Sequence, residues 1–238
     1  MPGGVTITWL GHGSWQHVSP EGVRILVDPW FEGNPSAPEG IAPVADVILL
    51  THGHFDHVAD ARSVQGRSDG APVYAKFELA TLLANRGIDP VIGFNTGGTA
   101  THEGLRFTMT VAHHSSSVTD ADGHQHYAGE PAGYVITFEN GYRIYQAGDT
   151  TVFGDMALIG ELYRPDLAIL PIGDFYTMGP YEAAKAVELL GVKEVIGGHW
   201  GTFEALSGTP QGLRDELAKR GVQGVTVHDL APGASLAP

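Results

Sequence analysis

A cluster of metal-binding side chains directly follows a predicted buried strand, and it constrains this chain more than any other feature. The strand covers residues 47–50, and the next segment reads THGHFDH, residues 51–57. Imidazoles and a carboxylate this close together would crowd and repel one another when protonated, whereas a divalent cation would hold them by coordination. His52 and His54 are spaced to converge on one ion, while Asp56 and His57 turn toward a second. The motif therefore predicts a binuclear metal centre, because a polar surface loop with unrelated histidines explains this density poorly.

A metal site with four or more ligands takes them from several strand ends, so further ligands are expected elsewhere in the chain. Three positions directly follow other predicted strands: His113 or His114, then Asp149, and then His199. Taken singly, Asp149 is compatible with a turn and His199 with an ordinary loop histidine. Together with the 51–57 motif, these residues predict one composite site.

The composition excludes several classes of protein. Of the 238 residues, 42% are hydrophobic and 17% are charged, which is typical of a globular domain with a sizeable core. The chain has no cysteine, so any metal is held by His and carboxylates. Thirteen Lys and Arg against 27 Asp and Glu give a net charge of -14. Because this charge repels polyanions, we expect a small-molecule substrate and no nucleic-acid partner.

The sequence shows neither a signal peptide nor an apolar run of roughly 18 residues that would cross a bilayer. We therefore expect a cytoplasmic protein without membrane attachment. Homo-oligomer formation is common among enzymes of this size and is compatible with the sequence.

Short apolar runs rich in Val, Ile and aromatic residues alternate with amphipathic segments. Strands are predicted at 5–10, 23–27, 47–50, 105–111, 133–138, 142–145, 167–170, 195–196 and 225–227. Helices are predicted at 77–86, 155–163, 181–190 and 210–220. The Glu139-Asn140-Gly141 turn favours an antiparallel hairpin, and the later strand-helix alternation favours parallel crossovers. We expect one α/β domain over residues 1–238, with two mixed sheets, helices outside them, and long functional loops at 32–45 and 115–131.

The order His-x-His-x-Asp-His, then His, Asp and His, each at a strand end, resembles the metallo-β-lactamase superfamily. Local motifs are similar to its stand-alone branch of metal-dependent hydrolases, which is related to the ascorbate-phosphate lactonases and more distantly to N-acyl-phosphatidylethanolamine phospholipases. These motifs are WLGH at 9–12, LVDP at 26–29, AHHSS at 112–116, GDT at 148–150 and LPIG at 170–173. The resemblance spans nearly the whole chain and implies a four-layer αβ/βα sandwich with the metals at one edge between the sheets.

The resemblance also implies which residues hold each metal. The first ion is assigned to His52, His54 and His114, the second to Asp56, His57 and His199, and Asp149 bridges the two. His114 is preferred to His113 because the family's ligand directly precedes the small residues of the loop, here Ser115, and because neighbouring side chains of a strand alternate faces. His113 is then expected to be a core imidazole or one that orients a ligand.

The implied activity is that of a metal-dependent hydrolase. Two divalent ions lower the pKa of a shared water, and the bridging hydroxide attacks an ester, lactone, amide or phosphodiester of a small molecule. Asp56 is expected to act as a weak catalytic proton acceptor from that water. Zinc is the default metal, and manganese, iron or nickel also suit nitrogen and oxygen ligands. The run Ser115–Ser117 is not expected to supply a nucleophile, because no triad surrounds it.

Two other enzyme classes are alternatives to the hydrolase. An iron-dependent redox enzyme is disfavoured because di-iron reductases of the fold tend to have a carboxylate where this chain has His54, and because no flavin module is present. A metal-dependent ribonuclease is disfavoured by the net charge of -14. A metal-binding module without catalysis is disfavoured because no ligand position is lost.

Several further residues have two compatible roles. Asp28 and His12 lie at predicted strand ends, where each would be placed to orient a ligand's imidazole. Turn capping is favoured for Asp28, and the two roles are equally supported for His12. His124 and His126 are expected on the surface rather than in contact with substrate, and Tyr176 is expected to line the pocket or to pack in the core.

Overall fold

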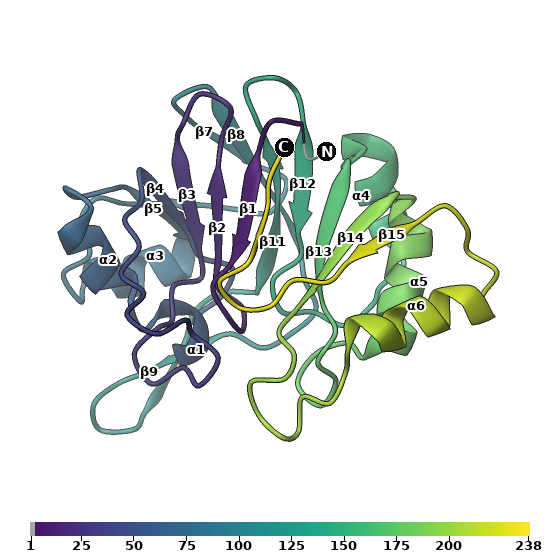
Figure 1. Cartoon of the computed structure of the whole chain (residues 1–238). Helices are drawn as coiled ribbons and strands as arrows, with labels where there is room; N and C mark the ends of the chain where they lie inside the picture. The colour runs from purple at the N-terminus through teal and green to yellow at the C-terminus, as the bar shows by residue number, and fades with distance from the viewer. Residues whose placement is uncertain (1–2) are drawn as a thin grey trace.

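The computed structural model describes residues 3–238, so the first two residues of the expected 1–238 domain lie outside the described part. Two seven-stranded sheets pack face to face, with helices on the outer side of each (Figure 1). This arrangement confirms the predicted four-layer sandwich. The strands are β1 Thr6–Trp9, β2 Trp15–Val18, β3 Arg24–Val27, β4 Val47–Leu49, β5 Val73–Lys76, β6 Val91–Phe94, β7 Thr99–His102, β8 Leu105–Val111, β9 Ser117–Thr119, β10 Gln125–Tyr127, β11 Ala132–Thr137, β12 Arg143–Gln146, β13 Leu167–Pro171, β14 Glu194–Gly198, β15 Thr226–His228 and β16 Ser235–Leu236. The helices are α1 Phe55–Val58, α2 Ala61–Arg67, α3 Phe77–Ala84, α4 Met156–Tyr163, α5 Pro180–Leu190 and α6 Pro210–Lys219.

Both sheets are mixed, as the sequence predicted. The first has the order β16-β1-β2-β3-β4-β5-β6, with antiparallel pairs up to β3 and parallel pairs from β3 to β6. The second has the order β15-β14-β13-β12-β11-β8-β7. Its antiparallel pair β11 and β12 is joined by the predicted Glu139-Asn140-Gly141 turn. The helices α4, α5 and α6 connect its parallel strands β12 to β15.

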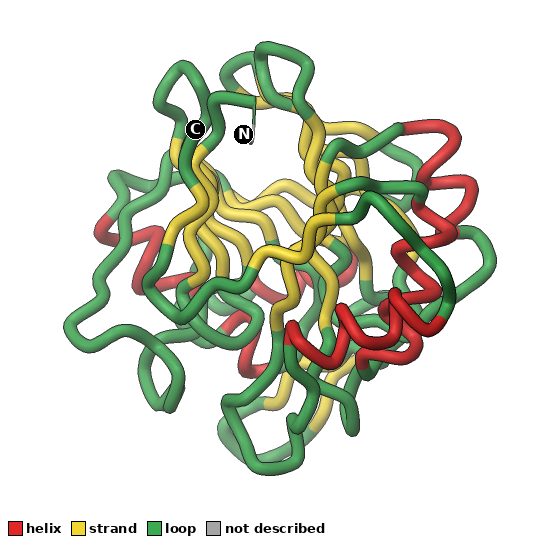
Figure 2. Tube along the Cα trace, turned by 45° about the vertical axis from the view of Figure 1, so that its right-hand side comes forward, coloured by secondary structure: helices red, strands yellow, loops and turns green. Residues whose placement is uncertain are grey.

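The core has three parts, one between each pair of layers. Side chains of both sheets, Trp9, Trp15, Phe107 and Tyr134 among them, form the part between the sheets. A second part joins the second sheet to α4, α5 and α6, and a third joins the first sheet to α2 and α3. Figure 2 shows the strands in the middle of the molecule with helices on both sides. Every residue of β4 and β13 is buried, because both faces of these strands are covered.

The structure corrects the expected loop at 115–131. That segment contains β9 and β10, which pair as an antiparallel hairpin. The sequence carries only a weak signal for this hairpin, because β10 is exposed along its whole length and so lacks a hydrophobic face. The other expected loop, 32–45, contains no helix or strand, whereas β2, β5, β6, β7, β16, α1 and α2 were not predicted.

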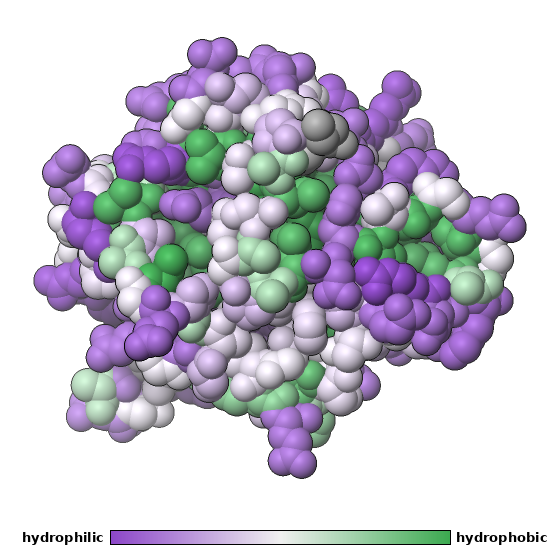
Figure 3. All heavy atoms as spheres, viewed as in Figure 1, coloured by the Kyte–Doolittle hydropathy of each residue, from purple (hydrophilic) through white to green (hydrophobic). Residues whose placement is uncertain are grey.

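The surface is mostly polar in the view of Figure 3, where hydrophilic residues cover much of the outer face and hydrophobic ones form smaller patches between them. Among residues 3–238, none of the helices has both the length and the apolar character that crossing a bilayer requires.

His17 gives the core a testable dependence on pH. It points from β2 into the core with Trp15, is fully buried, and forms no hydrogen bond through either ring nitrogen. Burial lowers the pKa of His17 from 6.5 to about 4. Between these values the unfolded chain takes up a proton that the folded protein does not, so we expect stability to fall as the pH drops from 6.5 toward 4.

The expected loss from His17 alone is roughly 3 kcal/mol of unfolding free energy. Urea unfolding of the metal-free wild-type protein and of His17→Leu at several pH values measures it. The variant is expected to lose less stability on acidification than the wild type. A constant difference between the two proteins across this pH range would contradict the assignment.

Candidate metal centre

The predicted site residues meet at one edge of the sandwich, at the bottom of Figure 1, where chain segments leave the carboxyl ends of strands. His52 follows β4, Asp149 follows β12 and His199 follows β14. Because these three strands belong to parallel arrays, their carboxyl ends open on the same edge. The short helix α1 begins directly after His54 and carries Asp56 in its first turn.

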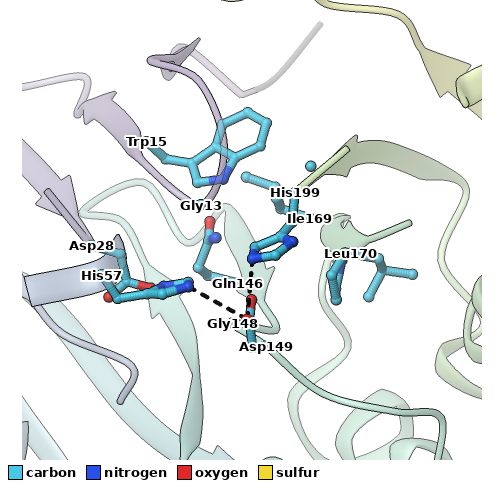
Figure 4. Close-up of a pocket in the computed structure, with 12 residues that line it drawn as sticks. Gly13, Trp15, Asp28, His57, Gln146, Gly148, Asp149, Ile169, Leu170 and His199 are labelled. Atoms are coloured by element: carbon cyan, nitrogen blue, oxygen red, sulfur yellow. Dashed lines mark hydrogen bonds and ion pairs between the residues drawn. The ribbon is translucent and has the colours of Figure 1, made fainter. Parts of the chain in front are cut away.

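The carboxylate of Asp149 lies at the centre of the site. Its Oδ2 atom faces Nε2 of His199 at 3.2 Å, His57 at 3.4 Å, His114 at 3.7 Å and His52 at 4.0 Å. Figure 4 shows the rings of His57 and His199 directed at this carboxylate. The turn before it needs Gly148, which has φ +64° and where a Cβ would lie 2.8 Å from Thr51 Cβ.

The carboxylate of Asp56 forms a second focus. Its Oδ2 atom lies 3.6 Å from Nε2 of His57 and 3.8 Å from Nε2 of His199. The side chains include two separate sets of closely spaced ligand atoms, and a third set, Asp28, His52 and His57, overlaps both. One set is His52, His54 and His114, and the other is His12, Asp56, His57 and His199. Asp149 Oδ2 faces members of both sets.

The buried carboxylates require positive charge beside them. Burial opposes the ionisation of Asp149, yet the imidazoles of His199 and His57 outweigh it and hold the pKa of Asp149 well below its usual range. In the same way, burial opposes a charged His199, and Asp149 overrides it and raises the pKa of His199 to about 9. The pKa of His57 is also raised, because Asp149, Asp56 and Asp28 together outweigh its burial. By contrast, burial lowers the pKa of His52 well below its usual value.

The donor set fits divalent metal ions. Nε2 of His57 and Nε2 of His199 are buried and have no hydrogen-bond partner, although both face Asp149. Unpaired buried polar atoms are costly in a protein interior unless something coordinates them. Three or more imidazoles with one or two carboxylates are the ligand chemistry of zinc and similar ions.

A chain of hydrogen bonds orients the imidazoles of His57 and His52 toward the site. Nδ1 of His57 donates to Asp28 Oδ2 at 2.8 Å, and the Thr51 hydroxyl donates to the same oxygen at 2.6 Å. Since its hydrogen is used there, Thr51 Oγ1 accepts from Nδ1 of His52 at 3.0 Å. In both imidazoles Nδ1 therefore keeps its hydrogen, which makes Nε2 the nitrogen that would bind a metal. Nε2 of His52 lies 3.0 Å from Nδ1 of His54. Asp28 also accepts from the backbone N–H of Thr51, a structural role of the kind favoured for it, and its bond to His57 adds the orienting role. The sequence did not show the orienting role, because only the fold places Asp28 behind His57.

His12 orients Asp56. Its Nε2 atom donates to Asp56 Oδ2 at 2.9 Å, and its Nδ1 atom lies 2.9 Å from Thr202 Oγ1. Burial lowers the pKa of His12 to about 4 in spite of Asp56, so the ring is neutral at pH 7 and Nδ1 accepts from Thr202. Sequence reasoning gave no signal for Thr202, because only the fold brings it to His12.

Backbone strain also collects at this edge. His12, Asp28 and His199 have φ values of +52°, +48° and +54°, which side-chain-bearing residues seldom adopt. Such strain persists where the surrounding structure enforces it, and it is concentrated at functional sites.

Other predicted residues lie elsewhere. His113 is exposed and packs beside Phe153 with ring centroids 4.8 Å apart, so the expectation of a core or ligand-orienting imidazole was wrong. His114 turns toward the site instead, with its Nε2 atom 3.7 Å from Asp149 Oδ2. His124 and His126 are exposed on the β9–β10 hairpin, where His126 pairs with Asp120 at 2.7 Å, as expected of surface histidines.

A cleft of about 510 Å³ opens directly over Asp56 and Asp149. Tyr176 lines it and is 57% exposed, which favours the pocket role over core packing. Phe55 and Phe203 also line the cleft. Sequence analysis did not single them out, because an isolated aromatic residue in a loop gives no periodic signal.

Comparisons with known proteins agree with this geometry. A family model described as the beta-lactamase superfamily domain matches residues 23–200. A protein of Rubrobacter xylanophilus named UPF0173 metal-dependent hydrolase is 48% identical over 238 residues, which cover 99% of this chain and 98% of that protein. One of the same name from Herpetosiphon aurantiacus is 49% identical over 219 residues, 90% of each chain. The solved structure of Igni18, a metallo hydrolase from the archaeon Ignicoccus hospitalis, has a TM-score of 0.84 and 33% identity, and the match covers 98% of this chain and 97% of Igni18.

Proposed function

Since this chain belongs to the metallo-β-lactamase superfamily and is a metal-dependent hydrolase, we propose that it works with two divalent metal ions, zinc by default, on a small molecule. The bond cut is an ester, lactone, amide or phosphodiester bond. One observation carries the proposal: a single carboxylate oxygen, Asp149 Oδ2, faces the Nε2 atoms of four imidazoles within 4.0 Å. Shared ligands of this kind are typical of binuclear hydrolytic centres.

The proposed ligands follow the two sets of side chains. His52, His54 and His114 hold the first ion, Asp56, His57 and His199 hold the second, and Asp149 is shared. When bound, such ions would lower the pKa of water and so supply a hydroxide nucleophile at neutral pH. They would also polarise the oxygen of the substrate's scissile group.

The protein's own side chains orient the proposed metal ligands. Asp28 and Thr51 fix the hydrogen of two imidazoles on Nδ1, and His12 fixes the orientation of Asp56. We retain Asp56 as a weak catalytic proton acceptor. It is weak because His57 and His12 outweigh burial and lower its pKa.

The same proposal includes a small-molecule partner, no nucleic acid, no membrane, and a cytoplasmic location. The net charge of -14 supports the exclusion of nucleic acid, because polyanions are repelled.

Metal analysis of the purified protein tests the proposal together with activity. We expect about two equivalents of divalent metal and turnover of at least one compound among a p-nitrophenyl ester, a lactone, a β-lactam and bis-p-nitrophenyl phosphate. Treatment with a chelator is expected to remove both metal and activity, and added zinc or manganese to restore them. Turnover that persists in metal-free protein would contradict the proposal, and tightly bound iron with dioxygen consumption would favour the redox alternative.

A further inference from the structure

We propose that the substrate carries an uncharged apolar group beside a scissile acyl bond, and that the cleft selects against phosphodiesters and other anions. This inference rests on the proposed hydrolase function and narrows its substrate class. In the hydrolysis that it describes, water adds its hydroxyl group to the acyl carbon, the acyl C–O or C–N bond breaks, and the proton goes to the departing oxygen or nitrogen, which leaves as an alcohol or amine.

Aromatic side chains form a wall at the mouth of the cleft. Phe55, Tyr176 and Phe203, here called the aromatic wall, all line the cleft and are 64%, 57% and 39% exposed. Single exposed apolar side chains are ordinary on protein surfaces, whereas their collection around a concave polar centre is typical of ligand sites. In Figure 3 green and white residues lie side by side at the lower edge of the molecule, where Figure 1 places the site.

The aromatic wall spans both halves of the fold. Phe55 begins α1 after a strand of the first sheet, whereas Tyr176 and Phe203 follow strands β13 and β14 of the second. Trp30 supports the wall from behind, with ring centroids 5.5 Å from Phe55 and 6.2 Å from Phe203. A substrate on the metal centre between the sheets therefore meets apolar surface from both sides.

Among residues 3–238, neither Lys nor Arg lines the rest of the cleft. Besides the wall, the lining consists of His12, proposed ligands, and the uncharged side chains of Ser115, Ser117, Thr119 and Gln125. All 13 Lys and Arg of the chain belong to the described residues, and none of them lines the cleft. Sites that bind phosphate esters or carboxylates usually supply Arg or Lys for the anion. An anionic substrate would find attraction only at the proposed metal ions and the imidazoles around them, within a protein of net charge -14.

The loop that carries Tyr176 is strained, although its aromatic residues gain little burial. Asp174 and Phe175 have φ values of +68° and +57°. The loop is closed by bonds from Tyr176 N to Asp174 O at 2.7 Å and from Asp174 N to Met178 O at 3.0 Å. Phe175 remains 71% exposed, so core packing does not account for this conformation. A strained loop that presents an aromatic ring to the cleft indicates a role in binding.

Matched esters test the inference. We expect kcat/KM for p-nitrophenyl hexanoate to exceed that for the mono-p-nitrophenyl ester of adipic acid by about tenfold or more. The two acyl chains have the same length and differ in a terminal carboxylate. We also expect the hexanoate to exceed p-nitrophenyl acetate, and bis-p-nitrophenyl phosphate to be the poorest substrate.

Variants connect this preference to the aromatic wall. Tyr176→Ala and Phe203→Ala are each expected to lower the hexanoate-to-acetate ratio by roughly threefold to tenfold, because each removes apolar contact with the longer chain. Phe77→Ala is the matched control. Phe77 is also an exposed aromatic residue, at 56%, but it does not line the cleft, so its loss is expected to leave the ratio unchanged.

Binding of p-nitrophenyl hexyl ether, which lacks the acyl bond, gives a readout that does not need turnover. Calorimetry is expected to show binding that weakens about threefold or more in Tyr176→Ala and Phe203→Ala but not in Phe77→Ala. Such binding without turnover of any ester would support the apolar cleft and overturn the hydrolase proposal. Turnover with equal rates on hexanoate and adipate esters, or with the phosphodiester as best substrate, would overturn the apolar cleft alone. If the protein shows neither binding of the ether nor turnover of any substrate, both the apolar cleft and the hydrolase proposal are overturned.

Discussion

Asp149→Asn is expected to lower kcat/KM at least about 10³-fold, equivalent to roughly 4 kcal/mol, and to reduce the bound metal from two equivalents to one or fewer. The reason is the position of Oδ2, which faces four imidazole nitrogens from both sets of proposed ligands. An amide has no net charge to balance divalent ions in a buried site, and its nitrogen coordinates them poorly. Metal content by elemental analysis and kcat/KM on the best ester are the two measurements.

The control for this variant is Asp155→Asn, which makes the same chemical change in an exposed residue. The Asp155 side chain forms no capping hydrogen bond at the start of α4, so the control is expected to retain both metals and full activity. Thermal unfolding of metal-free protein separates loss of metal from loss of fold. Two retained equivalents in a folded Asp149→Asn protein would show that Asp149 does not bridge the ions.

Asp28→Asn is expected to weaken metal binding by about 10-fold to 100-fold without removing a ligand. Asp28 accepts three hydrogen bonds, from Thr51 N, the Thr51 hydroxyl and Nδ1 of His57. The new side chain presents an NH₂ group in place of one oxygen. In place of Oδ1 it faces Thr51 N, and in place of Oδ2 it faces both the Thr51 hydroxyl and Nδ1 of His57. Where it faces His57, the ring is driven to the tautomer with hydrogen on Nε2, and that hydrogen blocks the nitrogen proposed to bind metal.

Two Thr51 variants separate the orientation of His52 from that of His57. Thr51→Val removes the hydroxyl between His52 and Asp28, whereas Thr51→Ser keeps it and serves as the matched control. We expect Thr51→Val to weaken the binding of only the ion assigned to His52. We expect Asp28→Asn to weaken the binding of the ion assigned to His57 as well. Metal titration measures affinity, and NMR of ¹⁵N-labelled histidine reports the tautomers directly. Unchanged tautomers and unchanged affinity in Asp28→Asn would contradict the orienting role.

The sequence predicted the main elements because strong local signals mark them. The buried strands β4 and β13 and the helices α5 and α6 have hydrophobic patterns that need no knowledge of their neighbours. The short exposed strand β10 lacks such a pattern, and the four-residue helix α1 is too short to show one. Their conformations depend on the segments that they meet in the fold.

The sequence by itself determined the residue types of the proposed metal ligands and their placement at strand ends, since a strand fixes which residue follows it and the 51–57 motif is typical of metal binding. Only the tertiary structure decided which distant groups support them. It set Asp28 behind His57, Thr202 behind His12, and the aromatic wall around the cleft. The physical reason is that side-chain hydrogen bonds and contacts form between residues far apart in the chain, and no local pattern specifies their distances.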